Sequence, residues 1–221
     1  MIKMAHKRNN SKIFTEIKGE LKDGYAYLEY VPEWNVLVDE YYRASLALVD
    51  AMKHWRGVDA QLTYPALFVA KSYLELELKC LSSNLEKISN GKAKRNFGHN
   101  LQKIFSEFVA LTKKTFDGGL GDFYFLKAFV YEFQDDPRGD LYRYSRDGKG
   151  NKTIFQNQCV NLLALRAYLV ETRRRLKILN EWLVTLHSFR EKGNYKMPDQ
   201  KNMKKYLVDR LAERHMHFGQ F

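Results

Sequence analysis

The sequence contains few of the residues that interrupt helices or cross-link chains. Its 221 residues include only 4 prolines and 13 glycines, so long helices are expected. It has two cysteines, Cys80 and Cys159. Both lie in apolar stretches that predict buried core thiols, and their spacing matches no zinc or redox motif. Because no disulfide framework is indicated, we expect a reducing, cytoplasmic compartment.

Long hydrophobic runs and cofactor motifs are also missing. No window of 18 uninterrupted apolar residues exists, and residues 1–14 are basic without the apolar run of a signal peptide, so we expect no membrane span and no secretion. The stretch Gly148–Thr153 superficially resembles a phosphate-binding loop, but Lys149 is followed by Gly150 where that loop needs Ser or Thr. With no carboxylate–histidine metal cluster either, no metal and no cofactor are expected.

What the sequence does contain is a large apolar fraction and a basic excess. Hydrophobic residues make up 45% of the chain and aromatic residues 14%, which is typical of a folded core. Residues 1–110 carry 16 Lys/Arg against 13 Asp/Glu, and residues 111–221 carry 21 against 13, for a net charge of +11. An excess of this size favours a polyanionic partner such as nucleic acid. A solvated basic surface without a ligand is the alternative.

Hydrophobic periodicity predicts an all-α fold. Helices are expected over 36–55, from Tyr64-Pro65 onward with Pro65 in the first turn, from an N-cap at Asn100, and over 123–133. Alternating residues and turn signals predict a small inserted β-hairpin near 140–156. The predicted organisation is an N-terminal arm (1–34), a helical bundle with the hairpin insertion (35–190), and a basic C-terminal helix packed on the same domain (191–221).

The strongest periodic signal is a stripe of leucines at intervals of three and four, which we call the leucine seam. Its members are Leu162, Leu165, Leu169, Thr172, Leu176, Leu179, Leu183 and Leu186. It predicts one helix of about 30 residues. The seam is suited either to the interior of a single-chain bundle or to a homodimer interface.

Two short motifs resemble those of a known superfamily. Glu75, Leu78 and Lys79 fit an E-x-x-L-K helix, and Gly98, His99, Asn100 and Leu101 fit a G-H-[DN]-L helix start. In this order they resemble members of the HEPN superfamily (higher eukaryotes and prokaryotes nucleotide-binding domains), over roughly residues 35–190. The stretch Asp136–Asp147 resembles an insertion seen in uncharacterised bacterial relatives.

The resemblance implies an up-and-down helical bundle that is frequently a homodimer. It also implies a role in bacterial stress or phage defence, including toxin–antitoxin pairs with an antitoxin partner protein. Many members cleave RNA without a metal, using an Arg and a His separated by four to six residues.

Arg210 and His215 have this Arg–His spacing, and they are the candidate catalytic pair. A neutral His can deprotonate a ribose 2′-hydroxyl while a nearby Arg stabilises the charge of the phosphorane. The alternative is a solvated basic helix, since 14 arginines and 6 histidines give about one such spacing by chance. The residue after Arg210 is Leu211, where the superfamily usually has a polar residue.

Basic and aromatic residues form two candidate nucleic-acid contacts. Tyr142, Arg143, Tyr144 and Arg146 interleave rings and cations on the predicted hairpin, a pattern suited to stacking bases and neutralising phosphates. The run Arg173–Arg175, which comprises Arg173, Arg174 and Arg175, is expected on the outward face of the seam helix, as a phosphate contact or as a solvated face.

The superfamily-motif residues have simpler structural explanations too. Glu75 and Lys79 are an i,i+4 pair that can support a helix surface, and His99 can cap or pack the helix that it precedes. The sequence therefore predicts an RNA- or nucleotide-associated protein that is a metal-independent endoribonuclease if it is an enzyme. The alternative is a non-catalytic dimerising scaffold that binds a partner protein.

Overall fold

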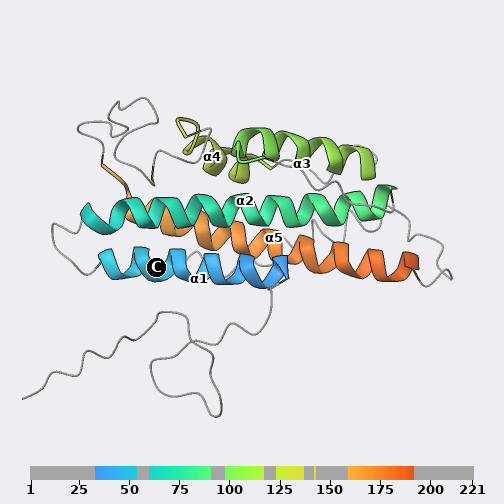
Figure 1. Ribbon diagram of the computed structural model, residues 1–221, viewed down its shortest axis with the longest axis horizontal. Coiled ribbons are helices and arrows are strands. Elements are labelled where there is room, and N and C mark those ends of the chain that lie inside the picture. The colour runs from blue at the N-terminus through green and yellow to red at the C-terminus, as the bar shows by residue number, and fades with distance from the viewer. Residues whose placement is uncertain are drawn as a thin grey trace, which may run out of the picture. The chain divides into compact units, whose positions relative to one another are not determined.

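The structure, a computed structural model, describes residues 33–53, 60–90, 98–116, 123–136, 142 and 159–191. These residues form five α-helices and no strand: α1 (Trp34–Lys53), α2 (Ala60–Asn90), α3 (Leu101–Thr115), α4 (Tyr124–Tyr131) and α5 (Leu162–Glu191) (Figure 1). The predicted all-α class is confirmed for the residues that the structure describes. Of the predicted hairpin near 140–156 only Tyr142, in a turn, is described. The C-terminal segment 192–221 and nearly all of the arm 1–34 also lie outside the described residues.

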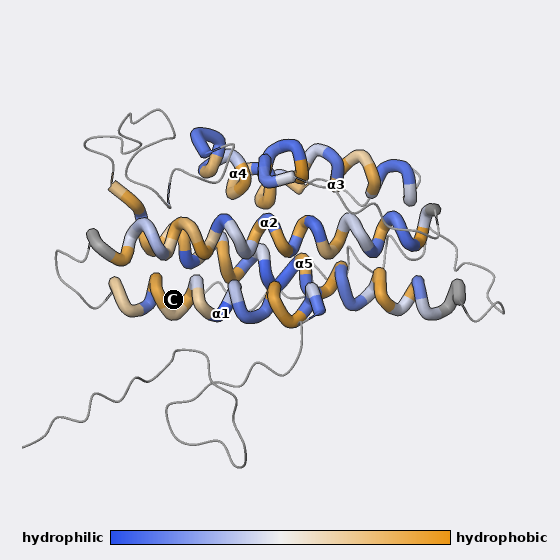
Figure 2. The backbone as a smooth tube through the Cα atoms, viewed as in Figure 1, coloured by the Kyte–Doolittle hydropathy of each residue, from blue (hydrophilic) through white to orange (hydrophobic). Residues whose placement is uncertain are grey.

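Helix α2 is the central helix, in contact with α1, α3 and α5. Leu74, Leu78, Leu81 and Leu85 are fully buried along it, and Figure 2 shows the short-interval alternation of hydrophobic and hydrophilic residues that gives a helix a buried stripe. The helix begins at Ala60, so Pro65 lies inside it and not in its first turn as predicted. Proline is tolerated there because the one backbone hydrogen bond that it removes lies close to the helix start.

Helix α5 confirms the predicted 30-residue helix, and the leucine seam lies on its buried side. Seven of the eight seam residues are buried, and Leu162 at the helix start is partly buried. The described chain itself therefore covers the seam, as expected of a single-chain bundle interior. Thr172 is the polar interruption, and its Oγ1 is buried without a hydrogen-bond partner among the described residues.

Polar contacts fix the relative directions of the long helices. Glu77 and Asn84 of α2 contact Arg173 and Asn180 of α5, so these two helices run in the same direction. Contacts between α1 and α5 run in the opposite sense. Asp39, early in α1, contacts Arg173, whereas Asp50, later in α1, contacts Arg166, which comes earlier in α5. Helix α1 is therefore antiparallel to both (Figure 1).

Helix α3 departs from a strict up-and-down order. His99, just before it, lies beside Glu75 in the middle of α2, whereas Phe116 at its end packs on Trp182 near the end of α5, with ring centroids 5.0 Å apart. Helix α3 therefore runs in the same direction as α2 and α5. The predicted N-cap is confirmed, since Asn100 Oδ1 accepts a hydrogen bond from Lys103 N at 2.9 Å.

The two cysteines differ from each other. Cys80 is buried as predicted, and burial raises the pKa of its thiol to about 11, so it is an inert core residue. The prediction for Cys159 is wrong: this residue precedes α5 and is exposed. Its apolar neighbours in the sequence gave a misleading signal, because Val160 and Leu163 are themselves exposed.

No helix in the described part of the chain has the length and apolar character needed to cross a membrane.

Candidate functional site

The superfamily-motif residues meet at one place, where the start of α3 lies against α2. Glu75 Oε1 accepts a hydrogen bond from Lys79 Nζ at 2.6 Å and lies 2.9 Å from His99 Nδ1. Glu75 and Lys79 come from consecutive turns of α2, whereas His99 is 24 residues away in sequence from Glu75. We call this group the Glu75–Lys79–His99 cluster.

Backbone geometry brings His99 to this cluster. Gly98 has a φ of +61°, in the left-handed region that L-residues with a side chain rarely adopt, which explains the glycine of the motif. No atom lies where a Cβ would be added, so the backbone conformation and not crowding selects glycine. Asn100 then caps α3 and fixes the first turn. The motif residues Gly98, His99 and Asn100 thus have distinct roles: turn, contact and cap.

In this cluster the carboxylate of Glu75 orients the imidazole of His99, which faces solvent. The His99 side chain is 75% exposed, whereas those of Glu75 and Lys79 are largely buried. Because Glu75 engages Nδ1, the ring orientation is held and Nε2 remains available to a ligand. Such an imidazole can transfer a proton or contact a phosphate. The expected i,i+4 pair is confirmed, and Glu75 additionally orients His99, a contact that spacing alone does not predict.

The run Arg173–Arg175 is engaged by carboxylates. Arg173 donates to Glu77 Oε2 at 2.9 Å and to Asp39 Oδ1 at 3.0 Å, and its side chain is only 14% exposed. The expectation of an outward face is therefore wrong for Arg173, which points toward α1 and α2. Arg174 and Arg175 both pair with Glu171 on the same helix. Phosphate binding by these three arginines remains a prediction, in competition with these acids.

Arg173 is part of a buried polar layer that sequence reasoning missed. Burial raises the pKa of Glu77 to about 7 despite the opposing effect of Arg173. The hydroxyl of Tyr73, one turn before Glu77 on α2, interacts with the Glu77 carboxyl, and both groups are buried. Burial likewise raises the pKa of Tyr73. An available signal was the position of Glu77, three residues before the buried Cys80 and four before the buried Leu81.

A second buried ion pair was also missed. Lys71 Nζ lies 2.9 Å from Asp136 Oδ2 and donates to the Asp136 carbonyl at 2.7 Å, and both side chains are almost fully buried. This pair ties α2 to the turn after α4. It is structural in position, because it closes the bundle and faces no solvent.

The other predicted site residues are outside the described part of the chain. This applies to the candidate catalytic pair, Arg210 and His215, and to Arg143, Tyr144 and Arg146. Within the described residues, no group of three His, Cys, Asp or Glu side chains is arranged to hold a metal ion.

Charge is distributed unevenly between the helices and the rest of the sequence. The described residues carry 15 Lys/Arg against 14 Asp/Glu, a net charge of +1. The remaining residues carry 22 Lys/Arg against 12 Asp/Glu, a net charge of +10. Nearly all of the basic excess thus belongs to the segments before, between and after the described helices.

Comparison with known proteins gave no relative: no protein-family model, no curated protein and no solved structure matches the chain. The HEPN resemblance therefore depends on the short motifs alone.

Proposed function

We propose that this protein is a HEPN-like, RNA- or nucleotide-associated protein of bacterial stress or phage defence. The observation that carries the proposal is the charge distribution. A helical core of net charge +1 is joined to segments of net charge +10, and a polyanion is the natural partner of such segments.

The Glu75–Lys79–His99 cluster supports the same proposal. The basic run Lys92–Arg95 ends three positions before Gly98 and four before His99 in the sequence. RNA held by this run would therefore come close to the exposed imidazole that Glu75 orients. Residues that contact the same ligand must lie close together, as Glu75, Lys79 and His99 do. The proposal also includes two features of the fold: that the helices form a HEPN-like bundle and that a β-hairpin is inserted near 140–156.

The catalytic part of the proposal assigns metal-independent RNA cleavage to Arg210 and His215. In this scheme His215 removes the proton of a ribose 2′-hydroxyl, whose oxygen attacks the adjacent phosphorus. Arg210 stabilises the charge on the phosphorane.

The test is cleavage of labelled total RNA and tRNA in EDTA by the full chain. We expect wild type and His187→Ala, the matched control on α5, to cut, and His215→Ala to lose at least about a hundredfold in rate, the usual contribution of a general base. Binding to a labelled single-stranded RNA is measured in parallel, and its log K should fall with log salt with a slope of about −3 if four phosphates are contacted.

The outcomes separate the alternatives. RNA binding with this salt dependence but no cutting by folded wild type would refute the catalytic assignment and leave the RNA association. If the folded wild type neither binds nor cuts RNA, the proposal is refuted. That result would favour the non-catalytic scaffold that binds a partner protein.

A further inference from the structure

The outward side of α4 presents two tyrosines to solvent. Tyr124 and Tyr131 are 71% and 46% exposed. They are seven residues apart on one helix, so they lie on the same side of it, about 10 Å from each other along its axis. The other exposed positions of α4 are Lys127 and Ala128, which lie between the two tyrosines. We call Tyr124, Lys127 and Tyr131 the α4 tyrosine face.

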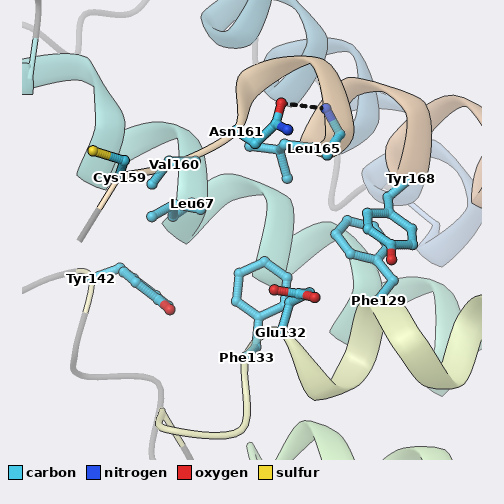
Figure 3. Close-up of a pocket in the computed structure, with 11 residues that line it drawn as sticks. Leu67, Phe129, Glu132, Phe133, Tyr142, Cys159, Val160, Asn161, Leu165 and Tyr168 are labelled. Carbon is cyan, nitrogen blue, oxygen red and sulfur yellow. Dashed lines mark hydrogen bonds between the residues drawn. The ribbon is translucent and has the colours of Figure 1, made fainter.

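The opposite side of α4 anchors this helix in the bundle. Leu126, Phe129 and Val130 are buried there. Phe129 is stacked on Tyr168 of α5, with ring centroids 5.0 Å apart and planes 9° apart (Figure 3). The same two residues also line a pocket of about 410 Å³ beside the first turns of α5. Because its buried side is held in this way, α4 presents the tyrosine face in a fixed orientation before any ligand arrives.

The α4 tyrosine face combines aromatic rings with a cation. Lys127 Nζ lies 5.6 Å from the ring centroid of Tyr131, so a base stacked on this ring would have an ammonium group close to its phosphate. No branched aliphatic side chain is exposed among the residues of α4, all of which the structure describes. The core of a protein–protein interface is usually depleted in lysine. Aromatic rings interleaved with cations are instead typical of surfaces that bind single-stranded nucleic acid.

The sequence that follows α4 adds positive charge for such a ligand. Residues 137–158 carry five Lys/Arg against two Asp/Glu, a net charge of +3. They include the run Tyr142–Arg146, in which aromatic and basic residues alternate. A polyanion attracted by these cations would therefore be held by residues that directly continue the chain from α4.

We infer that the α4 tyrosine face stacks two bases of a single-stranded RNA, with Lys127 at a phosphate between them. The inference rests on the proposed RNA association and names the surface that contacts bases. The rings are separated by about three times the roughly 3.4 Å repeat of a stacked strand, so they take two bases that are unstacked from each other. Glu132 and Asp135 follow Tyr131, are exposed and repel phosphate, so Tyr124 at the other end of α4 is the stronger platform.

The test compares a labelled single-stranded RNA with the duplex of the same sequence. Binding of each to the full chain is measured by fluorescence anisotropy at several salt concentrations. We expect Tyr124→Ala to weaken binding of the single strand about tenfold, the usual effect of losing one base–aromatic stack, and Tyr131→Ala to weaken it less. Both variants should keep the wild-type salt slope and the wild-type affinity for the duplex, whose bases are stacked within the helix. Tyr124→Phe, which keeps the ring, should bind as the wild type does.

Lys127→Gln provides a complementary test, because it removes the cation and keeps both rings. The slope of log K against log salt for the single strand should become shallower by about 0.7, the contribution of one phosphate contact. Lys177→Gln, the same change at an exposed position of α5, should leave the slope unchanged. Circular dichroism checks that each variant is folded.

The outcomes separate this inference from the proposed function. If the wild type binds RNA and both alanine variants bind the single strand equally well, the inference is overturned and the RNA association remains. If the folded wild type binds no RNA, both are overturned. Loss of self-association in Tyr124→Ala with unchanged RNA affinity, measured by analytical ultracentrifugation, would also overturn the inference, because the face would then contact a second copy of the chain.

Discussion

The buried carboxyl of Glu77 predicts an unusual dependence of stability on pH. Its side chain is only 1% exposed, and burial raises its pKa from 4.5 to about 7 in the folded protein. In the unfolded chain this carboxyl titrates at its ordinary value. Between pH 4.5 and 7 the folded state therefore binds more protons than the unfolded state, so the free energy of unfolding falls as the pH rises through this window.

The size of the effect follows from the two pKa values. A difference of about 2.5 units corresponds to about 3 kcal/mol, lost progressively from pH 4.5 to pH 7. The groups that face Glu77 are Arg173 on α5, Asp39 on α1 and Tyr73 on α2. Arg173 opposes the shift, but Arg173 is shared with Asp39, so it does not fully compensate the loss of hydration of Glu77.

The assay is urea unfolding followed by circular dichroism at pH 5, 6, 7 and 8, with wild type and Glu77→Gln compared at each pH. Glutamine keeps the shape of the side chain but cannot ionise. We expect the wild type to lose stability relative to Glu77→Gln as the pH rises, by about 3 kcal/mol over the whole window. The comparison removes the contributions of other titrating groups, because both proteins share them.

A constant difference between the two proteins from pH 5 to pH 8 would refute the reasoning. A difference that grew in favour of the wild type would reverse its sign. That result would mean that Arg173 outweighs burial and keeps Glu77 charged in the folded protein. The control substitution is Glu181→Gln, which changes an exposed carboxyl; Glu86→Gln is less suitable because Glu86 is also buried.

Three further substitutions test the described contacts, each by chemical denaturation. Lys71→Met should cost about 3–5 kcal/mol because it leaves Asp136 buried without its cation, whereas Lys177→Met, at an exposed pair, should cost less than about 0.5 kcal/mol. Asn100→Ala should cost about 1 kcal/mol through loss of the N-cap of α3. Hydrogen bonds from Arg174 hold the pKa of Glu171 at about 2, so this carboxylate stabilises the fold above pH 4.5, and the contribution is lost as the pH falls through 2. Glu171→Gln should therefore destabilise by about 0.5–1 kcal/mol at pH 7, the range of exposed pairs, and have no effect near pH 2.

Periodicity predicted the helices well because each long helix has one continuous apolar stripe. The leucine seam indicated the full extent of α5, and Asn100 marked the start of α3 through its capping chemistry. The start of α2 was predicted too late, since Pro65 was assigned to a first turn that lies several residues earlier. A proline restricts where a helix can continue but does not determine where it begins.

The polar layer could not be predicted in the same way. Arg173 was expected to face solvent because an arginine within a basic run usually does, and its burial depends on two acids from other helices. Asp39 and Glu77 lie 134 and 96 residues away from it in the sequence. Only the tertiary arrangement shows that these carboxylates meet at one guanidinium. The same holds for Glu75 and His99, whose motif spacing indicated a relation but not a contact.

The charge distribution separates the requirements of folding from those of ligand binding. Within the helices, the cations of Arg166, Arg173 and Lys71 are each committed to a carboxylate, so they hold the bundle together and have little capacity for a polyanion. A ligand that depends on counterion release needs cations whose pairing it can take over at low cost. Those cations are supplied by segments outside the helices, where Lys92–Arg95 is one example. Substitutions in that run should therefore weaken RNA binding and reduce its salt slope while the free energy of unfolding is unchanged. Substitution of Arg173 should lower the free energy of unfolding and leave RNA binding by the folded protein unchanged.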